Sequence, residues 1–202
     1  RASIELEDSE IKTELRMAYT IPLANPATER LAFKAELTEE QKGDILGRKS
    51  EIGVSVSKVF GRLRQSTYLD YEYERTQAPA TPDAVSHLLV PGASLAYTVT
   101  DAPLFVRHGH RLAADVHGAH EGLISDATFL QYGLSAKLVR SFGASRFITR
   151  GSYASTLIAD ASELPASQRL FAGGDQSVRG YGYESIGPTD INGNVVGGTE
   201  SF

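Results

Sequence analysis

Strict alternation of apolar and polar residues constrains this chain more than any other feature. The segment 62–75 reads RLRQSTYLDYEYER. Successive side chains of a β-strand point to opposite sides of the sheet, so this pattern predicts a strand with one apolar and one charged face. The apolar face holds Leu63, Thr67, Leu69, Tyr71 and Tyr73, and the charged face holds Arg64, Ser66, Asp70, Glu72 and Glu74.

The same alternation recurs along the chain, and no segment shows a convincing helical period. Most of the alternating segments exceed the roughly ten residues that a tilted membrane-spanning strand needs. The pattern therefore predicts an all-β fold of about nine strands, which begin near residue 2 and continue over 10–21, 29–39, 49–60, 62–75, 87–99, 107–117, 128–142 and 147–160.

The connections between these segments are of two kinds, and the two kinds alternate. Tight connections carry Gly, Pro, Asn and Asp, which supply the backbone angles of turns, at 22–29, 59–63, 100–105 and 141–147. Longer polar connections lie between them at 39–50, 76–87 and 118–126, and a glycine-rich stretch follows residue 160. Tight turns at one end and longer loops at the other predict an antiparallel up-and-down meander.

Two architectures accommodate such a meander. In a soluble β-sandwich the apolar faces meet in a core, and strands of about five or six residues suffice. In a membrane barrel the apolar faces meet lipid, the charged faces line a lumen, and longer strands are required. Strand length and the asymmetry of the loops favour the barrel.

Composition excludes several classes of protein. The 202 residues include 20 Lys and Arg against 25 Asp and Glu, a formal net charge of -5, which argues against a nucleic-acid partner. The absence of cysteine excludes disulfides and thiolate metal sites. No apolar run is long enough for a membrane-spanning helix, and residues 1–20 lack the pattern of a signal peptide. Because the chain opens on Arg1, we expect it to be an internal piece of a longer protein.

The stretch 169–188, RLFAGGDQSVRGYGYESIGP, surrounds Arg179 with glycines. A phosphate-binding loop is disfavoured, because the stretch has neither the required lysine nor a following helix. A simple hairpin is disfavoured because the whole connection runs to roughly thirty residues, whereas tight hairpins need about two. The remaining interpretations are a loop that turns inward, with Arg179 in a forked contact, and a surface loop with a solvated arginine.

This stretch resembles the barrel signature of the outer-membrane protein assembly superfamily, which includes BamA, TamA and the two-partner secretion transporters. The matching elements are VRGY at 178–181 and FAGGD at 171–175. YTIPLANP at 19–26 and SRFITRGSY at 145–153 resemble TamA more than BamA. The resemblance implies a functional loop containing Gly173, Gly174, Asp175, Val178, Arg179, Gly180 and Tyr181.

The resemblance implies that residues 1–202 form a single partial domain of a sixteen-stranded transmembrane β-barrel. Residues 167–197 would form a long extracellular loop that folds into the lumen, where Arg179 contacts the barrel wall. The periplasmic domains, the first two strands and the last four would lie outside this sequence.

The function implied by the resemblance is insertion or translocation of β-barrel or autotransporter clients at the bacterial outer membrane. The implied partners are the lipid bilayer, the client proteins and a TamB-like periplasm-spanning protein, with no cofactor and no enzymatic activity. A soluble ligand-binding or structural β-domain and a passive outer-membrane pore are the alternatives.

Two other groups of residues invite chemical hypotheses. His108 and His110 share one strand face, but His117 lies on the other, which disfavours a metal site formed with His120. The carboxylates on the charged face of 62–75, Asp70, Glu72 and Glu74, are of the residue types that form catalytic carboxylate pairs. Acids at alternate positions of one strand are more typical of a lumenal or solvated row.

Overall fold

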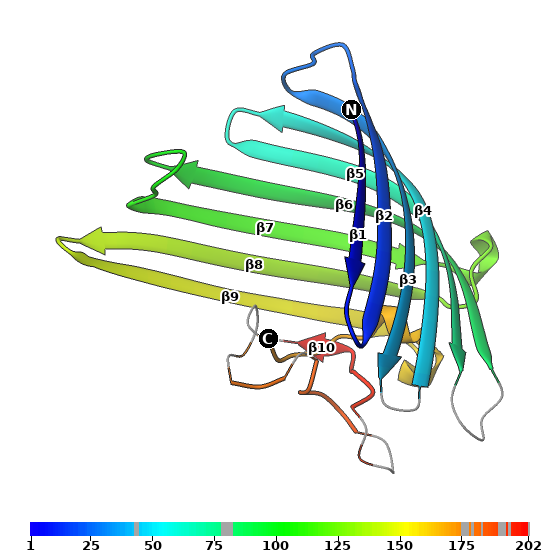
Figure 1. Ribbon diagram of the computed structural model, residues 1–202. Coiled ribbons are helices and arrows are strands. Elements are labelled where there is room, and N and C mark those ends of the chain that lie inside the picture. The colour runs from blue at the N-terminus through cyan, green and yellow to red at the C-terminus, as the bar shows by residue number, and fades with distance from the viewer. Residues whose placement is uncertain are drawn as a thin grey trace. The chain divides into compact units, whose positions relative to one another are not determined.

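A computed structural model describes residues 1–42, 45–77, 83–174, 178, 180–182, 184–189, 193 and 195–201. Within these residues there are ten strands and three short 3₁₀ helices, and no helix is long and apolar enough to cross a membrane (Figure 1). The strands are β1 (Ala2–Asp8), β2 (Lys12–Pro22), β3 (Glu29–Lys42), β4 (Ile45–Phe60), β5 (Leu63–Gln77), β6 (Ala84–Thr100), β7 (His108–Ala119), β8 (Phe129–Phe142), β9 (Ser145–Ile158) and β10 (Glu200–Ser201). The 3₁₀ helices are η1 (Glu121–Leu123), η2 (Ala161–Glu163) and η3 (Ala166–Gln168).

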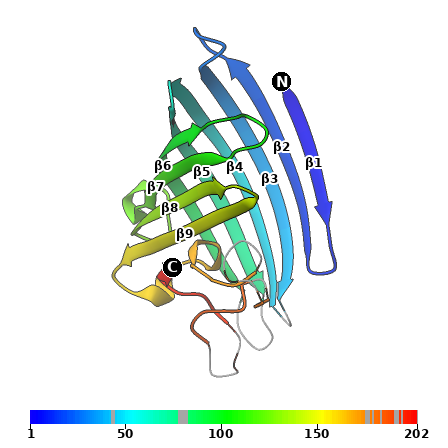
Figure 2. The ribbon, with the colours of Figure 1, turned by 90° about the vertical axis from the view of Figure 1, so that its left-hand side faces the viewer.

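The strands hydrogen-bond in the order of the sequence, from β1 to β10, in one sheet. Neighbours from β1 to β4 pair antiparallel, and Figure 2 shows these four strands side by side. The pairs β8–β9 and β9–β10 are antiparallel as well. The predicted all-β, up-and-down meander is therefore confirmed.

The two-residue strand β10 differs from the predicted set of about nine strands. Glu200 lies opposite Ser155, and Ser201 lies opposite Ala154. Two residues are too few to show an alternating pattern, so the sequence carried no signal for this strand. Its pairing with β9 shows that the meander resumes after the long connection.

The predicted loop at 39–50 was wrong in its length. Strand β3 continues to Lys42 and β4 already begins at Ile45. Glu39 lies opposite Arg48, and its Oε2 accepts a hydrogen bond of 2.8 Å from the Arg48 Nε. The charges that suggested a loop are therefore a cross-strand pair of the kind that stabilises sheets.

The described chain divides into two compact units. The first comprises residues 1–60, 65–93 and 118–128, and the second comprises 61–64, 94–117 and 129–202. Strands β1 to β4 lie in the first unit, and β8 to β10 lie in the second. The polar face, the long connection and the apolar hollow described below each lie within one unit.

Burial in this sheet is inverted relative to a soluble protein. Leu6, Ile52 and Leu134 are 70%, 61% and 54% exposed, whereas the carboxylate residues Glu14 and Asp70 are only 1% and 5% exposed. Soluble proteins rarely leave so much contiguous apolar surface in water. The apolar face is therefore suited to a hydrocarbon environment, as in a membrane barrel.

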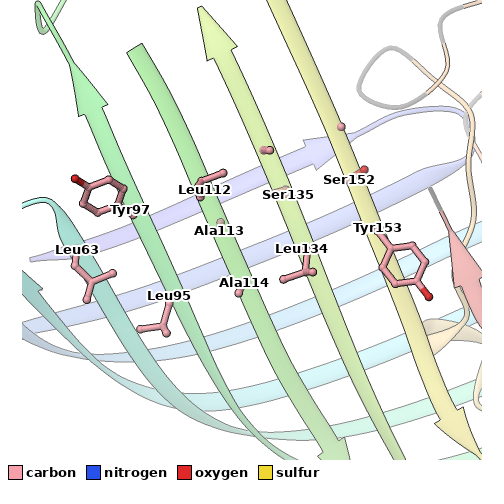
Figure 3. Close-up of a pocket in the computed structure, with 12 residues that line it drawn as sticks. Leu63, Leu95, Tyr97, Leu112, Ala113, Ala114, Leu134, Ser135, Ser152 and Tyr153 are labelled. Atoms are coloured by element: carbon pink, nitrogen blue, oxygen red, sulfur yellow. The ribbon is translucent and has the colours of Figure 1, made fainter.

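An apolar hollow of about 610 Å³ lies on the apolar face of the second unit. Its floor is formed by small residues, since Ala136 pairs with Gly151 across β8 and β9. Leucine and tyrosine side chains form its sides (Figure 3). These larger residues are Leu63, Leu95, Tyr97, Leu112, Leu134 and Tyr153.

The assignment of side chains to the two faces of β5 can be tested by cysteine labelling. In the full-length protein in a membrane, Ser66→Cys should react with a water-soluble maleimide, whereas Leu69→Cys should not, because the first side chain lies on the polar face and the second on the apolar face. Residues 1–202 contain no cysteine of their own. Preferential labelling of Leu69→Cys would reverse the assignment, since a register change of one residue exchanges the two faces.

Candidate functional site

The long connection between β9 and β10 begins on the polar face of β8 and β9. Gln131 on β8 lies opposite Thr156 on β9. The Gln131 side-chain amide donates to Thr156 Oγ1 at 2.6 Å and to the backbone carbonyl of Gln168 at 3.0 Å. All three residues are buried. The start of the connection is therefore fixed against the polar face of the strands.

A capped turn at Asp160 precedes the contact between Gln131 and Gln168. The Asp160 Oδ1 accepts hydrogen bonds of 2.8 Å from both the backbone N–H and the hydroxyl of Ser162. These two donors favour the ionised carboxylate and lower the pKa of Asp160 below its ordinary value. Leu164, which follows, is 1% exposed. The first residues after β9 are thus held by a cap and a buried leucine.

Arg169 joins the two ends of the connection. Its Nε donates to the Leu164 carbonyl at 2.9 Å, and its Nη1 donates to the Val196 carbonyl at 3.3 Å. Next to it, Leu170 and Gly198 form an antiparallel bridge. The planar guanidinium can bond both carbonyls in a fixed geometry. Sequence reasoning did not single out Arg169, because its role depends on a partner 27 residues away.

Beyond the contacts of Arg169 and Leu170, the glycine-rich segment turns back on itself. Gly173, Gly174 and Gly180 have positive φ angles of 111°, 93° and 92°, which glycine adopts readily and other residues rarely do. The Gly174 N–H donates to the Tyr181 carbonyl at 3.1 Å, and the Tyr181 N–H donates to the Val178 carbonyl at 3.4 Å. Glycine is thus required by the backbone at three of the predicted loop positions.

The structure describes some of the predicted loop residues and not others. Val178 is 36% exposed and Tyr181 is 60% exposed. Asp175 and Arg179 lie outside the described residues. The inward contact of Arg179 therefore stays a prediction.

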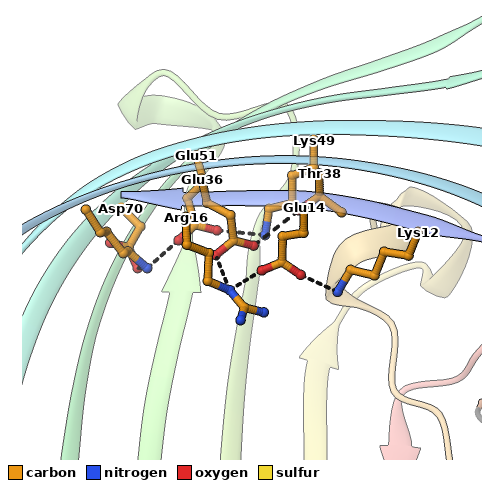
Figure 4. A network of polar contacts seen from close by, with 9 residues as sticks. Lys12, Glu14, Arg16, Glu36, Thr38, Lys49, Glu51 and Asp70 are labelled. Atoms are coloured by element: carbon orange, nitrogen blue, oxygen red, sulfur yellow. Dashed lines mark hydrogen bonds and ion pairs between the residues drawn. The ribbon is translucent and has the colours of Figure 1, made fainter. Parts of the chain in front are cut away.

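A network of ion pairs covers the polar face of β2 to β5 (Figure 4). Lys12 Nζ lies 2.6 Å from Glu14 Oε2. Arg16 pairs with the same Glu14 and also lies 3.6 Å from Glu36 Oε2. The Glu14 side chain has no exposed surface. Its charge is therefore compensated from both sides along one strand.

The second half of the network places each lysine between two carboxylates. Lys34 on β3 pairs with Glu51 on β4 and lies 2.9 Å from Asp70 Oδ2 on β5. Lys49 lies 2.9 Å from both Glu51 and Glu72. The three carboxylate side chains are each 8% exposed. The lysine side chains are 43% and 24% exposed, so solvent weakens these pairs relative to fully buried ones, but their geometry ties neighbouring strands together.

The comparison with known families decides the identity of the chain. The model of the Omp85 superfamily domain matches residues 1–202, which is the whole sequence. This chain belongs to the Omp85 superfamily. The family resemblance of the glycine-rich stretch is therefore confirmed. The finer likeness to TamA stays a prediction.

A solved structure has the same fold. The crystal structure of BamA from Haemophilus ducreyi lacking POTRA domains 1–3 matches with a TM-score of 0.82 and 17% sequence identity. The match covers 98% of this chain and 45% of that chain. The chain therefore spans less than half the length of this structure, and at this identity the likeness establishes the fold.

Gly53 is a residue that sequence reasoning missed in this Omp85 sheet. It lies opposite Lys34 on the polar face of β4. A Cβ at this position would overlap Asp70 Oδ1 and would lie 2.6 Å from Lys34 Cε. Real Cβ atoms do not approach other atoms so closely. The missing side chain at Gly53 is what lets Lys34 reach Asp70 across the intervening strand.

Replacing Gly53 by alanine should break the contact between Lys34 and Asp70. We expect Gly53→Ala to lower the free energy of unfolding by about 1–3 kcal/mol, measured by urea denaturation of the full-length protein in detergent micelles. Gly47→Ala is the matched control on the same strand face, because its nearest neighbour, Glu40 O, would be an ordinary 3.7 Å away. Equal stability of the two variants would contradict the role assigned to Gly53.

Gly197 makes a second prediction, at the base of the long connection. It has a φ of 74°, and an added Cβ would lie 2.6 Å from the Phe171 ring and 2.8 Å from Arg169 Cβ. Gly197→Ala should therefore lower stability by about 1–3 kcal/mol through overpacking and speed proteolysis within 159–199. Gly193→Ala is the control, because Gly193 has a φ of 85° but no atom within 4 Å. If both variants behave alike, the packing contact has no role.

The histidines have separate local partners. His108 Nδ1 lies 3.4 Å from Asp101, His117 Nδ1 lies 2.8 Å from Asp115, and His120 Nδ1 accepts from the Gly122 N–H at 2.9 Å. The His110 ring lies 5.9 Å from the Tyr97 ring in a tilted contact. Within the part of the chain that the structure describes, no group of three or more potential ligands could hold a metal ion. The contacts of these four histidines are to side chains and backbone nearby in turns and on neighbouring strands.

Proposed function

We propose that this chain is part of an outer-membrane protein insertion or translocation factor of the BamA and TamA type, which assists assembly of β-barrel or autotransporter clients. The observation that carries the proposal is the match of the whole chain to the Omp85 superfamily domain. The inverted burial of the sheet supports it, because an insertion factor works from within the bilayer.

The lipid bilayer is the first partner in this proposal. Exposed apolar residues such as Ile52 and Leu134 would face hydrocarbon, while the ion-paired face lines the lumen. The opposite arrangement would be costly, because a basic residue on the lipid face costs about 2–4 kcal/mol near the midplane. Bacterial outer membranes hold such barrels, and the same placement is proposed here.

The proposed mechanism uses the hydrogen-bonding capacity of strand edges. An unpaired edge presents a row of N–H and C=O groups that can template another strand, and strand addition is a general mode of polypeptide recognition. In a barrel of this type, a weakly paired seam would open toward the bilayer and pair with an incoming client strand. The process needs no cofactor and no covalent chemistry, so we propose that the protein is not an enzyme.

Two further parts of the proposal come from the family resemblance. A TamB-like periplasm-spanning protein would deliver clients or stabilise the barrel from below. The loop at 167–197 would fold into the lumen, and Arg179 would anchor it to the wall. Support for an inward loop comes from Gln131, which holds the Gln168 backbone against the polar face.

Substitution of Arg179 tests this function in the full-length protein. Arg179→Ala should lower both the heat resistance of the folded barrel on a gel and the yield of client insertion into proteoliposomes. Arg179→Lys should have a smaller effect on both, because lysine keeps the charge but loses the forked hydrogen bonds. Arg179→Ala should lower the free energy of unfolding by about 1.5–3 kcal/mol, which is the usual contribution of a hydrogen bond to a charged group.

Ser177→Ala is the control for these variants and should change neither measurement. Unchanged heat resistance and insertion in Arg179→Ala would refute the anchoring role and favour a surface loop. Ion conductance without client insertion by the wild-type protein would favour a passive pore. A wild-type protein that stays monomeric in buffer without detergent would favour a soluble β-domain.

A further inference from the structure

The apolar hollow of the second unit is open above its floor (Figure 3). Ala136 on β8 lies opposite Gly151 on β9, and both residues are exposed. A Cβ added at Gly151 would have no atom within 4 Å. The volume of about 610 Å³ falls in the range of small-molecule sites, roughly 300–1,000 Å³. Because an unfilled space forfeits dispersion contacts, an occupant that fills the hollow is favoured.

Arg140 is a cation on the same apolar face of β8. It is exposed and lies opposite Phe147. It is four residues from Ala136, which is roughly 13 Å along the strand. Neither β8 nor β9 contains an Asp or Glu. A basic residue on the lipid face of a barrel is costly at the bilayer midplane and nearly free of cost at the interface. We therefore expect Arg140 to lie at the level of the lipid headgroups.

Exposed aromatic side chains support this level for Arg140. Phe142 and Phe147 are 69% and 56% exposed, and aromatic residues form girdles at both interfaces of outer-membrane barrels. Strand β8 ends at Phe142 and β9 begins at Ser145, so the turn between them is tight. Short turns of such barrels lie on the periplasmic side. The hollow would then lie deeper in the bilayer than Arg140, within the periplasmic half.

We propose that the hollow and Arg140 together form a binding site for one anionic phospholipid. An acyl chain would occupy the hollow, and the Arg140 guanidinium would donate hydrogen bonds to the phosphate. The planar fork of arginine matches phosphate oxygens and makes charge-assisted hydrogen bonds to them. This inference rests on the proposed function, because that function places the apolar face of the sheet in the bilayer.

A lipid suits this site better than a client strand does. Strands β7 and β8 each lie between two hydrogen-bonded neighbours, so the floor of the hollow offers no free strand edge to a polypeptide. An acyl chain needs no hydrogen bonds and can follow the space between side chains such as Leu112 and Leu134. The chain of a lipid is surrounded by hydrocarbon whether it is bound or free. Selection among lipids should therefore come chiefly from the contact between Arg140 and the headgroup.

The headgroup contact is tested with the purified full-length protein in detergent micelles. Dioleoylphosphatidylglycerol is titrated, and the retained lipid is measured by native mass spectrometry. We expect tighter binding than for dioleoylphosphatidylcholine, which has the same acyl chains and no net charge. Arg140→Gln should weaken binding of the anionic lipid at least about tenfold, through loss of charge-assisted hydrogen bonds. Lys137→Gln is the matched control, because it removes a charge from the polar face of the same strand, and it should leave binding unchanged.

The hollow is tested by filling it. Gly151→Leu places a side chain in the open space above the floor, so it should weaken binding of both lipids several-fold without lowering the unfolding midpoint. Ala35→Leu is the control. Ala35 lies on the apolar face of β3, opposite Ile52, and it does not line the hollow. This variant should bind both lipids as the wild type does.

Several results would overturn the inference. These are equal binding of the two lipids by the wild type, equal loss in Arg140→Gln and Lys137→Gln, and full binding by Gly151→Leu. Complete displacement of the lipid by inorganic phosphate would show a phosphate site without a role for the hollow. A protein dimer that Gly151→Leu alone abolishes would assign the hollow to a second copy of the chain. Cross-linking of a client to a photoreactive residue at Leu134 would assign it to a polypeptide.

Client insertion by the wild type is measured separately. If the anionic lipid binds as expected but no client is inserted, the proposed function fails and the lipid site stands. If clients are inserted and the lipid is not retained, the lipid site fails and the function stands.

Discussion

Buried carboxylates on the polar face must be neutralised by neighbouring cations, because an uncompensated charge in such a place costs several kcal/mol. Lys34 and Lys49 meet this requirement by each reaching carboxylates on two strands. The requirement explains why these strands stay in register and why Gly53 must lack a side chain. It also allows the apolar side chains to remain on the outside. A sheet with this inverted burial has one fitting environment, in which the solvent on its apolar side is lipid.

Polar backbone groups of the long connection also have partners. Its carbonyls at Leu164, Gln168 and Val196 accept hydrogen bonds from Arg169 and Gln131, which avoids the penalty of leaving a desolvated polar group without a hydrogen bond. The anchor lies on the polar face, where such partners are available. The residues that precede the glycine-rich segment are thus fixed to the strands β8 and β9.

Prediction from the sequence succeeded where a feature is periodic and local. Strands β2 to β9 followed from alternation, and the tight turns at 22–29 and 59–63 followed from Gly, Pro and Asn. It failed where the signal was short or ambiguous. Strand β10 has two residues, and the charges of 39–50 fit a loop and a cross-strand pair equally well. The positive φ angles of Gly173, Gly174 and Gly180 agree with the expected freedom of that loop, while Arg179 lies outside the described residues.

By itself the sequence determined the all-β class, the two faces of each strand, the meander and the superfamily. These depend on the two-residue period of a strand and on a short motif, both of which can be read along one chain. Only the tertiary structure decided which charges meet, that Gly53 opens the path from Lys34 to Asp70, and that Arg169 joins residues from both ends of the long connection. It also decided that Lys137 lies opposite Arg150. The physical reason is that ion pairs and close contacts depend on register between strands, and register is a property of two segments together.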